Sequence, residues 1–293
     1  MNIKLLDFKI LKDFPSGSGI EFFDDLLYVV GDDAKDILVM NKRWKKKGVI
    51  NLFPADNNYR IPKSMKADFE ATAIIQINKN PFLLILGSGS IEATRNKGLI
   101  VDLTSRLSEE IDLSVFYTRL KQSGLKELNI EAAAVMNDKI ILCNRGNKLS
   151  QDNRIIITSS DFWKKQHDAE IIFVKIEWEK TPENFMALSG LAYSYKNDWL
   201  IITASTEETK NAIDDGLIGD SYLGIIENAS RKIGRKRIKL NTAMNLTQVD
   251  KLFKGHKIES VCMQADNERK LKLHLVADND NGESSLFKIR LSE

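Results

Sequence analysis

Short runs of hydrophobic residues recur along the chain in pairs, and polar turn residues separate the runs. Residues 19–23 precede residues 26–30, with Asp24 and Asp25 between them. The same arrangement returns in four later pairs, residues 69–73 with 82–87, 130–134 with 140–144, 189–193 with 199–204, and 258–262 with 273–278. The repeat is marked by positions 21, 70, 131, 190 and 259, which are 49, 61, 59 and 69 residues apart. A degenerate repeat of this length indicates a propeller or a solenoid.

The first repeat contains four short strand patterns within residues 19–52, and four strands make one propeller blade. We therefore predict an all-β protein, a five-bladed β-propeller that fills residues 1–293 as a single domain. The expected blades are residues 20–52, 69–120, 130–178, 189–240 and 258–291, the last completed by residues 2–11. This N-terminal strand would close the ring and leave no long sheet edge exposed. The alternative is a six-bladed ring with a degenerate blade within residues 103–128 or 241–256.

Charge and composition narrow the classes of partner. The 43 basic and 41 acidic residues leave a formal charge of +2, so nothing calls for nucleic acid or an anionic membrane. The basic clusters at residues 42–47 and 231–237 are interpreted as solvated side chains that protect strand edges. Cys143 and Cys262 lie in apolar runs and are read as reduced core thiols. Charges interrupt the N-terminal apolar run, which predicts a cytoplasmic protein unless a leader has been removed. We expect a monomer.

Two acidic features of the repeat should share one face of such a ring. The first strand of each blade lines the channel, and it begins on the same side as the loop between the second and third strands. Acids near the start of the first strands are Glu21, Glu70, Glu131 and Glu259, while Gly190 takes the fourth place. The loops add the candidate substrate-binding residues Asp32, Asp33, Arg95, Asn144, Arg145, Asp215 and Asp278, together with Glu207.

Four carboxylates that converge on one axis would repel one another unless a cation compensates them. Calcium, or another hard divalent cation, fits a face rich in carboxylate and amide oxygens. We therefore assign Glu21, Glu70, Glu131 and Glu259 as metal ligands. The alternative is that each glutamate pairs with backbone amides, Arg95 or Arg145 and only fixes blade packing.

Nucleophilic catalysis has little support, because none of the three histidines lies near a Gly-x-Ser-x-Gly motif. Hydrolysis would instead use water activated by the metal, with a ring carboxylate as the base. The catalytic candidates are Glu70, Glu131 and Glu207.

Several short segments resemble an uncharacterised bacterial propeller family, typical of Bacteroidetes and related to the phytase-like and esterase-like propellers. These segments are Gly19-Ile20-Glu21 with Gly31-Asp32-Asp33, Phe69-Glu70-Ala71, Ile130-Glu131-Ala132 with Asn144-Arg145-Gly146, Thr203-Ala204-Ser205 with Asp215-Gly216, and Ile258-Glu259-Ser260. The resemblance implies a calcium-dependent phosphoester or ester hydrolase whose metal-side residues are the four repeat glutamates. Propellers of the gluconolactonase group are a more distant analogy.

The chain departs from that pattern at Gly190, where Glu207 or Asp215 from the long loop would have to replace the missing acid. Two functions follow. The first is a divalent-metal hydrolase that acts on a small anionic substrate at the channel mouth. The second is a propeller that binds a ligand or protein through the same face without catalysis, because the fold does not fix the function.

Overall fold

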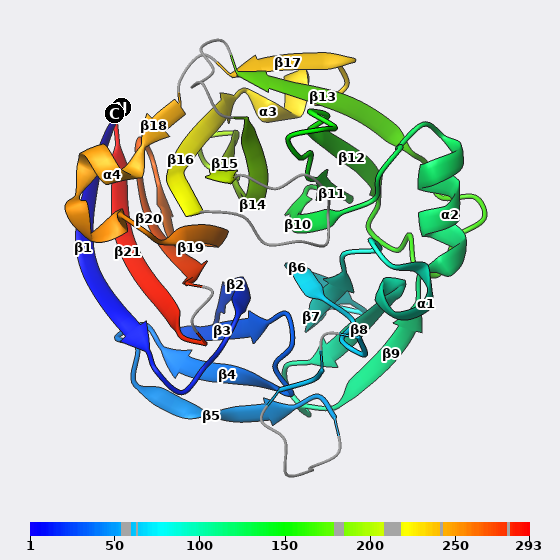
Figure 1. The fold of residues 1–293 in the computed structure, drawn as a ribbon, viewed down its shortest axis with the longest axis horizontal. Helices are drawn as coiled ribbons and strands as arrows, with labels where there is room; N and C mark the ends of the chain where they lie inside the picture. The colour runs from blue at the N-terminus through cyan, green and yellow to red at the C-terminus, as the bar shows by residue number, and fades with distance from the viewer. Residues whose placement is uncertain (54–59, 63, 179–184, 208–217, 241–242, 280–281) are drawn as a thin grey trace.

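The chain forms five small sheets arranged around a central axis, and their strands are antiparallel except for one outer pair in blade three (Figure 1). The computed structural model describes residues 1–53, 60–62, 64–178, 185–207, 218–240, 243–279 and 282–293. The prediction of a five-bladed β-propeller is confirmed, and the six-bladed alternative is wrong.

Four of the blades follow one another along the chain. Blade one contains β2 (Gly17–Phe23), β3 (Leu26–Gly31), β4 (Asp36–Asn41) and β5 (Lys46–Asn51). Blade two contains β6 (Phe69–Ile77), β7 (Asn80–Gly87), β8 (Lys97–Asp102) and β9 (Ser108–Asp112). Blade three contains β10 (Ile130–Met136), β11 (Lys139–Asn144), β12 (Arg154–Ser159) and β13 (Ile172–Trp178). Blade four contains β14 (Met186–Ser194), β15 (Trp199–Glu207), β16 (Ile218–Glu227) and β18 (Ala243–Asn245).

The two ends of the chain complete blade five. It contains β19 (Lys257–Asn267), β20 (Lys270–Asp278) and β21 (Ser284–Ser292), with β1 (Asn2–Leu11) as the fourth strand. β1 pairs antiparallel with β21 along its whole length, so the ring closes through backbone hydrogen bonds and the termini lie side by side (Figure 1). The prediction that the N-terminal strand closes the last blade is therefore confirmed.

Blade four differs from the prediction at its outer edge. The predicted range of this blade, residues 189–240, places its last strand at the end of that range. Instead β17 (Arg237–Leu240) pairs in parallel with β13 and becomes a fifth strand of blade three. Blade four receives the three-residue strand β18 in its place. Gly224 of β16 allows this exchange, because the Trp178 ring lies 2.7 Å from the position where a Cβ atom would stand.

Short helices cover the outside of the ring. They are α1 (Glu92–Arg95), α2 (Ser114–Gln122), α3 (Ala229–Lys232), α4 (Leu246–Val249) and the 3-10 helix at Lys251–Phe253. α2 lies between blades two and three and buries Phe116, Tyr117 and Leu120 completely. Tyr117 also donates its hydroxyl to the Gly87 carbonyl at 2.6 Å, which ties the helix to the end of β7.

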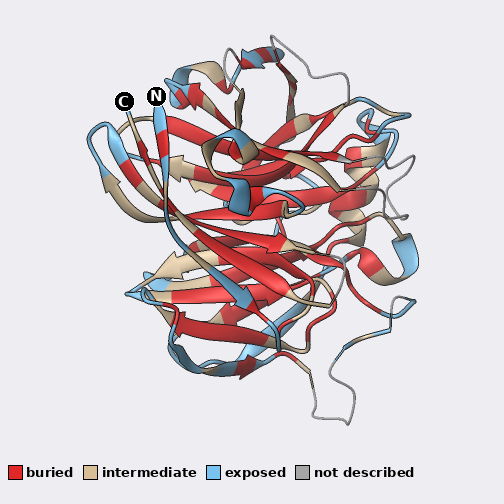
Figure 2. Cartoon of the chain, turned by 60° about the vertical axis from the view of Figure 1, so that its left-hand side comes forward, coloured by how far each residue is buried: buried red, intermediate tan, exposed pale blue. Residues whose placement is uncertain are grey.

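The hydrophobic core lies between neighbouring blades, so the strands nearest the axis are buried on both sides (Figure 2). Cys143 and Cys262 are free and buried within it. His274 is also buried, accepts a hydrogen bond at Nδ1 from Trp44 Nε1 at 3.1 Å, and is kept neutral by burial, which lowers its pKa to about 3. None of the described helices is long and apolar enough to cross a membrane.

Candidate functional site

A bulge in each innermost strand determines which side chains face the charged mouth of the channel. The pairing of the innermost strand with the second strand shifts by one residue in all five blades. The residues at these bulges are Ser18, Glu70, Glu131, Ser189 and Glu259. Bulges re-aim side chains and are frequent near functional sites.

The bulges correct the alignment of the repeats. Glu21 lies three residues beyond the bulge of β2, so its alignment with Glu70, Glu131 and Glu259 is wrong. The equivalent of these glutamates in blade one is Ser18. In blade four it is Ser189, not Gly190. The ring therefore holds three acids and two serines rather than four acids and a glycine.

The two serines lock neighbouring blades together. Ser18 Oγ donates to the Phe69 carbonyl at 2.5 Å, and Ser189 Oγ donates to the Ile258 carbonyl at 2.7 Å. A glycine follows each serine because the adjacent blade is close. A Cβ atom on Gly19 would lie 2.5 Å from Thr72 Cγ2 of blade two, and one on Gly190 would lie 3.0 Å from Ser260 Cα of blade five.

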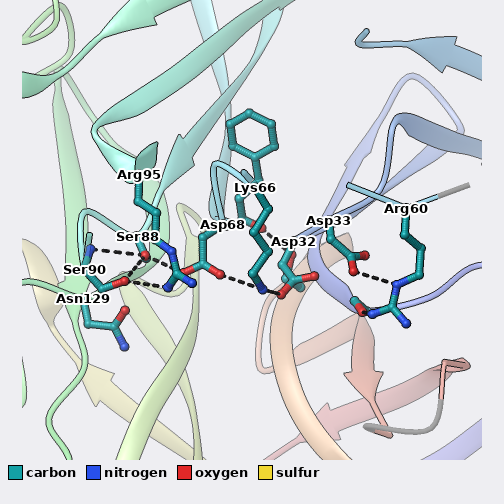
Figure 3. A network of polar contacts seen from close by, with 12 residues as sticks. Asp32, Asp33, Arg60, Lys66, Asp68, Ser88, Ser90, Arg95 and Asn129 are labelled. Atoms are coloured by element: carbon teal, nitrogen blue, oxygen red, sulfur yellow. Dashed lines mark hydrogen bonds and ion pairs between the residues drawn. The ribbon is translucent and has the colours of Figure 1, made fainter. Parts of the chain in front are cut away.

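Asp32, Asp68 and Glu70 form the densest group of acids in the described chain. One carboxylate oxygen from each lies within 4.8 Å of the others. Asp32 comes from the loop after β3, Asp68 directly precedes β6, and Glu70 occupies the bulge of β6. The ammonium group of Lys66 lies between two of them, paired with Asp32 Oδ2 and 2.8 Å from Asp68 Oδ1 (Figure 3).

Arg95 and two serines hold Asp68 from the other side. Arg95 Nη1 lies 2.5 Å from Asp68 Oδ2, and Ser88 Oγ donates to the same oxygen at 2.6 Å (Figure 3). Arg95 also donates to Ser90 Oγ at 2.7 Å. Arg95 is 2% exposed and its Nη1 already contacts Asp68 and Ser90, so the guanidinium that was expected to bind substrate is buried and engaged in this structure.

Asp33 belongs to a separate pair at the edge of the same network. Arg60 Nε lies 2.6 Å from Asp33 Oδ2, and Arg60 Nη2 donates to Ser16 Oγ at 2.8 Å (Figure 3). Asp32 Oδ1 and Asp33 Oδ1 are both buried and accept no hydrogen bond from the described residues. Buried oxygens of this kind are normally satisfied by a protein group, water or an ion.

Glu131 and Glu259 approach each other through Arg145. Arg145 Nη1 lies 3.3 Å from Glu131 Oε2 and 3.9 Å from Glu259 Oε2. Glu131 Oε1 accepts from Asn129 Nδ2 at 2.6 Å, and Glu259 Oε1 lies 3.0 Å from Lys257 Nζ. The structure thus brings together the three repeat acids that follow the bulge alignment.

The network gathers more negative than positive charge. Its carboxylates are Asp32, Asp68, Glu70, Glu131 and Glu259, and its cations are Lys66, Arg95, Arg145 and Lys257. Each of these cations contacts at least one carboxylate. Glu70 has no hydrogen bond or ion pair shorter than 4.0 Å with the described residues, which makes it the free carboxylate of the network.

Burial and crowding of charge change the pKa values at this mouth. Burial raises the pKa of Glu70 well above its ordinary value, and the Glu131, Asp68 and Asp32 carboxylates add to the effect. Burial also raises the pKa of Glu131 to about 7 despite the neighbouring Arg145 guanidinium. Burial raises the pKa of Asp32 to about 6, although the Lys66 ammonium opposes the shift. For Lys66 burial lowers the pKa, but the surrounding carboxylates outweigh it and the ammonium stays charged.

The remaining candidates are placed as follows. Asn144 ties two loops together, since its Oδ1 accepts from the Asn129 amide at 2.8 Å and its Nδ2 donates to the Glu127 carbonyl at 3.2 Å. Asp278 ends β20 opposite Lys257 in the strand register. Asp215 and the side chain of Glu207 lie outside the described residues.

Sequence reasoning missed Lys66, Asp68, Asn129 and Lys257. A signal for three of them exists, because Asp68, Asn129 and Lys257 each stand two residues before a bulge glutamate. In a strand, residues two apart share a face, so these polar residues belong to the same mouth.

Residues 13–291 match the family of unknown function DUF6929. The chain belongs to this family. The match gives no support to phytase-like naming. A search of curated proteins finds no match.

Solved propeller structures resemble the DUF6929 chain in fold. A glutaminyl cyclase from Myxococcus xanthus is 9% identical with a TM-score of 0.55, over 99% of this chain and 96% of that one. A streptogramin B lyase is 10% identical with a TM-score of 0.43, over 100% and 99%. A virginiamycin B lyase from Staphylococcus aureus is 10% identical with a TM-score of 0.41, over 99% and 100%. At these identities the likeness concerns the fold alone.

Proposed function

We propose that this DUF6929 protein is a divalent-cation-dependent hydrolase that cleaves a small anionic ester or phosphoester at the charged mouth of the channel. The observation that carries the proposal is the Asp32, Asp68 and Glu70 group, in which three carboxylates lie within 4.8 Å of one another. Glu70 is unpaired among the described residues, and one oxygen of Asp32 is buried without a hydrogen bond. A cation would relieve this excess of negative charge.

The donor set suits a hard cation, and calcium is the one that we expect. Carboxylate oxygens are preferred by calcium and magnesium, and the described residues offer neither thiolate nor imidazole in this group. When bound, the cation would polarise the substrate and lower the pKa of a water molecule. Lys66 is its competitor, because the ammonium already lies between Asp32 and Asp68.

Residues of the chain would supply the proton transfer and the contacts with the substrate. Glu131, with a pKa of about 7, can accept the proton of the attacking water and return it to the leaving oxygen. Displaced from the two aspartates, the Lys66 ammonium becomes available to the anionic group of the substrate. Asn129 holds Glu131 Oε1 at 2.6 Å and fixes the orientation of the carboxyl.

Calorimetry with calcium, magnesium and manganese on chelator-treated protein tests the cation site. We expect binding to the unmodified protein, weaker binding to Glu70→Gln, and tighter binding to Lys66→Met, which removes the competing ammonium. The matched control is Glu109→Gln, because Glu109 is exposed on β9 at the outside of blade two. Absence of binding, or weaker binding to Lys66→Met, would count against the cation site.

A panel of phosphomonoesters, carboxylic esters and lactones, assayed with and without calcium, tests the reaction. Loss of hydrolysis in Glu131→Gln with unchanged cation binding would support Glu131 as the proton carrier. Equal rates in Glu131→Gln and the unmodified protein would remove it from the mechanism.

A binding propeller without catalysis is the second candidate. The ion pairs of Arg95 and Arg145 with carboxylates favour it, since ion pairs of this kind also occur in structural networks. Cation binding that stabilises the protein, with no turnover of any substrate class, would support this second function.

A further inference from the structure

The opposite end of the channel contains a cavity of about 480 Å³ that the proposed reaction does not use. Its wall includes the residue three positions beyond the bulge in each innermost strand. These residues are Glu21, Ala73, Ala134, Ala192 and Cys262. Three residues of extended strand span about 10 Å, so this layer lies well below the acids of the charged mouth. Small residues in four blades make room for the cavity, and blade one contributes a carboxylate.

Glu21 is the only charged residue among the described residues that line the cavity. Thr72 Oγ1 donates to Glu21 Oε1 at 3.3 Å, and no described cation pairs with the carboxylate. Burial raises the pKa of Glu21 well above its ordinary value, with only the Thr72 hydrogen bond opposing the shift. When Glu21 is ionised, its carboxylate has no counter-ion among the described residues. A cationic ligand could supply one.

The cavity wall combines apolar and aromatic side chains with the neutral polar side chains of Gln76, Asn137 and Ser160. Phe22, Tyr193, Tyr195 and Met263 contribute, and the Tyr193 and Tyr195 rings meet edge to face with centroids 4.8 Å apart. Tyr195 is 57% exposed and stands at the rim. Aromatic faces attract cations, and the volume lies within the usual range of small-molecule sites.

We propose that this cavity is a second ligand site, which binds a hydrophobic organic ammonium ion. The ammonium would pair with Glu21, and its apolar part would contact the alanine-lined wall and the tyrosine rings. An anion would be repelled by Glu21, and a neutral apolar ligand would leave the carboxylate without a partner. A metal ion would find one carboxylate in the cavity and otherwise only neutral oxygens, whereas hard cations in proteins are usually held by more than one carboxylate.

Calorimetry with benzylammonium, benzyl alcohol and benzoate at neutral pH tests the proposal. We expect benzylammonium to bind at least about tenfold more tightly than benzyl alcohol, and benzoate not to bind. Glu21→Gln should reduce the preference for the ammonium to less than about twofold while circular dichroism shows an unchanged fold. Persistence of the preference in Glu21→Gln, or no binding of benzylammonium to the unmodified protein, would overturn the proposal.

A second variant keeps the test informative if Glu21→Gln does not fold. Tyr195→Ala changes an exposed side chain and should weaken benzylammonium binding about twofold to fivefold through the lost aromatic contact with the benzyl ring. Unchanged affinity in Tyr195→Ala would then count against the site. Glu70→Gln and excess chelator should leave benzylammonium binding unaltered. The proposal for this cavity and the proposal for the cation site at the other mouth are therefore tested independently.

Discussion

Glu131 provides a direct test of the electrostatics at the charged mouth. The residue is 6% exposed, and burial raises the pKa of its carboxyl to about 7, against about 4.3 in an unfolded chain. This difference of about 2.7 pKa units corresponds to about 4 kcal/mol of free energy. The folded protein keeps this proton at pH values where the unfolded chain has lost it. Stability from Glu131 is therefore fully present below about pH 4 and is lost as the pH rises to about 7.

The perturbation is Glu131→Gln, which cannot titrate but still offers an oxygen to Asn129. Urea unfolding at pH 5 and pH 8 should show the unmodified protein losing about 2 kcal/mol more free energy of unfolding than the variant over this interval. Asp32, whose pKa is about 6, also loses its proton as the pH rises. This lowers the free energy of unfolding of both proteins, so the contribution of Asp32 cancels in the comparison. Glu109→Gln on the exposed β9 strand should behave like the unmodified protein. Parallel pH dependence in Glu131→Gln and the unmodified protein would refute this account of the buried carboxyl.

Three other changes test how the blades are held together. Ser189→Ala removes the buried hydrogen bond to the Ile258 carbonyl and should lower the free energy of unfolding by about 1–3 kcal/mol in urea denaturation. Tyr117→Phe leaves the Gly87 carbonyl without its donor, and we expect a loss of about 1–2 kcal/mol by the same measurement, with the fold unchanged by circular dichroism. Deletion of residues 2–11 uncovers the edge of blade five and should produce aggregates in size-exclusion chromatography, whereas a soluble monomer would contradict closure by β1.

The sequence contained enough information for the fold because hydrophobic runs and turns repeat with each blade. The number of blades and the closure by β1 follow from counting strands. The pairing of β17 with blade three cannot be predicted by counting strands. The hydrophobic pattern of Arg237–Leu240 is compatible with a strand of blade three or of blade four. Gly224 and the Trp178 ring decide the packing there, and the sequence does not show that they meet.

The site was harder to predict because a bulge shifts the pairing of two strands by one residue. This shift changes which side chain faces the channel mouth but leaves the hydrophobic pattern of the sequence unchanged. Glu21 and Glu70 both follow an aliphatic or aromatic residue near a strand start, yet they face opposite ends of the channel. The dipeptides Ser18-Gly19 and Ser189-Gly190 were the available signal, because both place a serine at the bulge. Aligned on them, the repeat predicts that Glu21 lies apart from the other acids.

The distribution of acids and serines around the ring also explains why the charged mouth is one-sided. Ser18 and Ser189 hydrogen-bond to backbone carbonyls of the next blade, so they join blade one to blade two and blade four to blade five without adding charge. Arg145 links Glu131, the acid of blade three, to Glu259, the acid of blade five. A cation drawn to Asp32, Asp68 and Glu70 would therefore bind off the axis, between blades one and two.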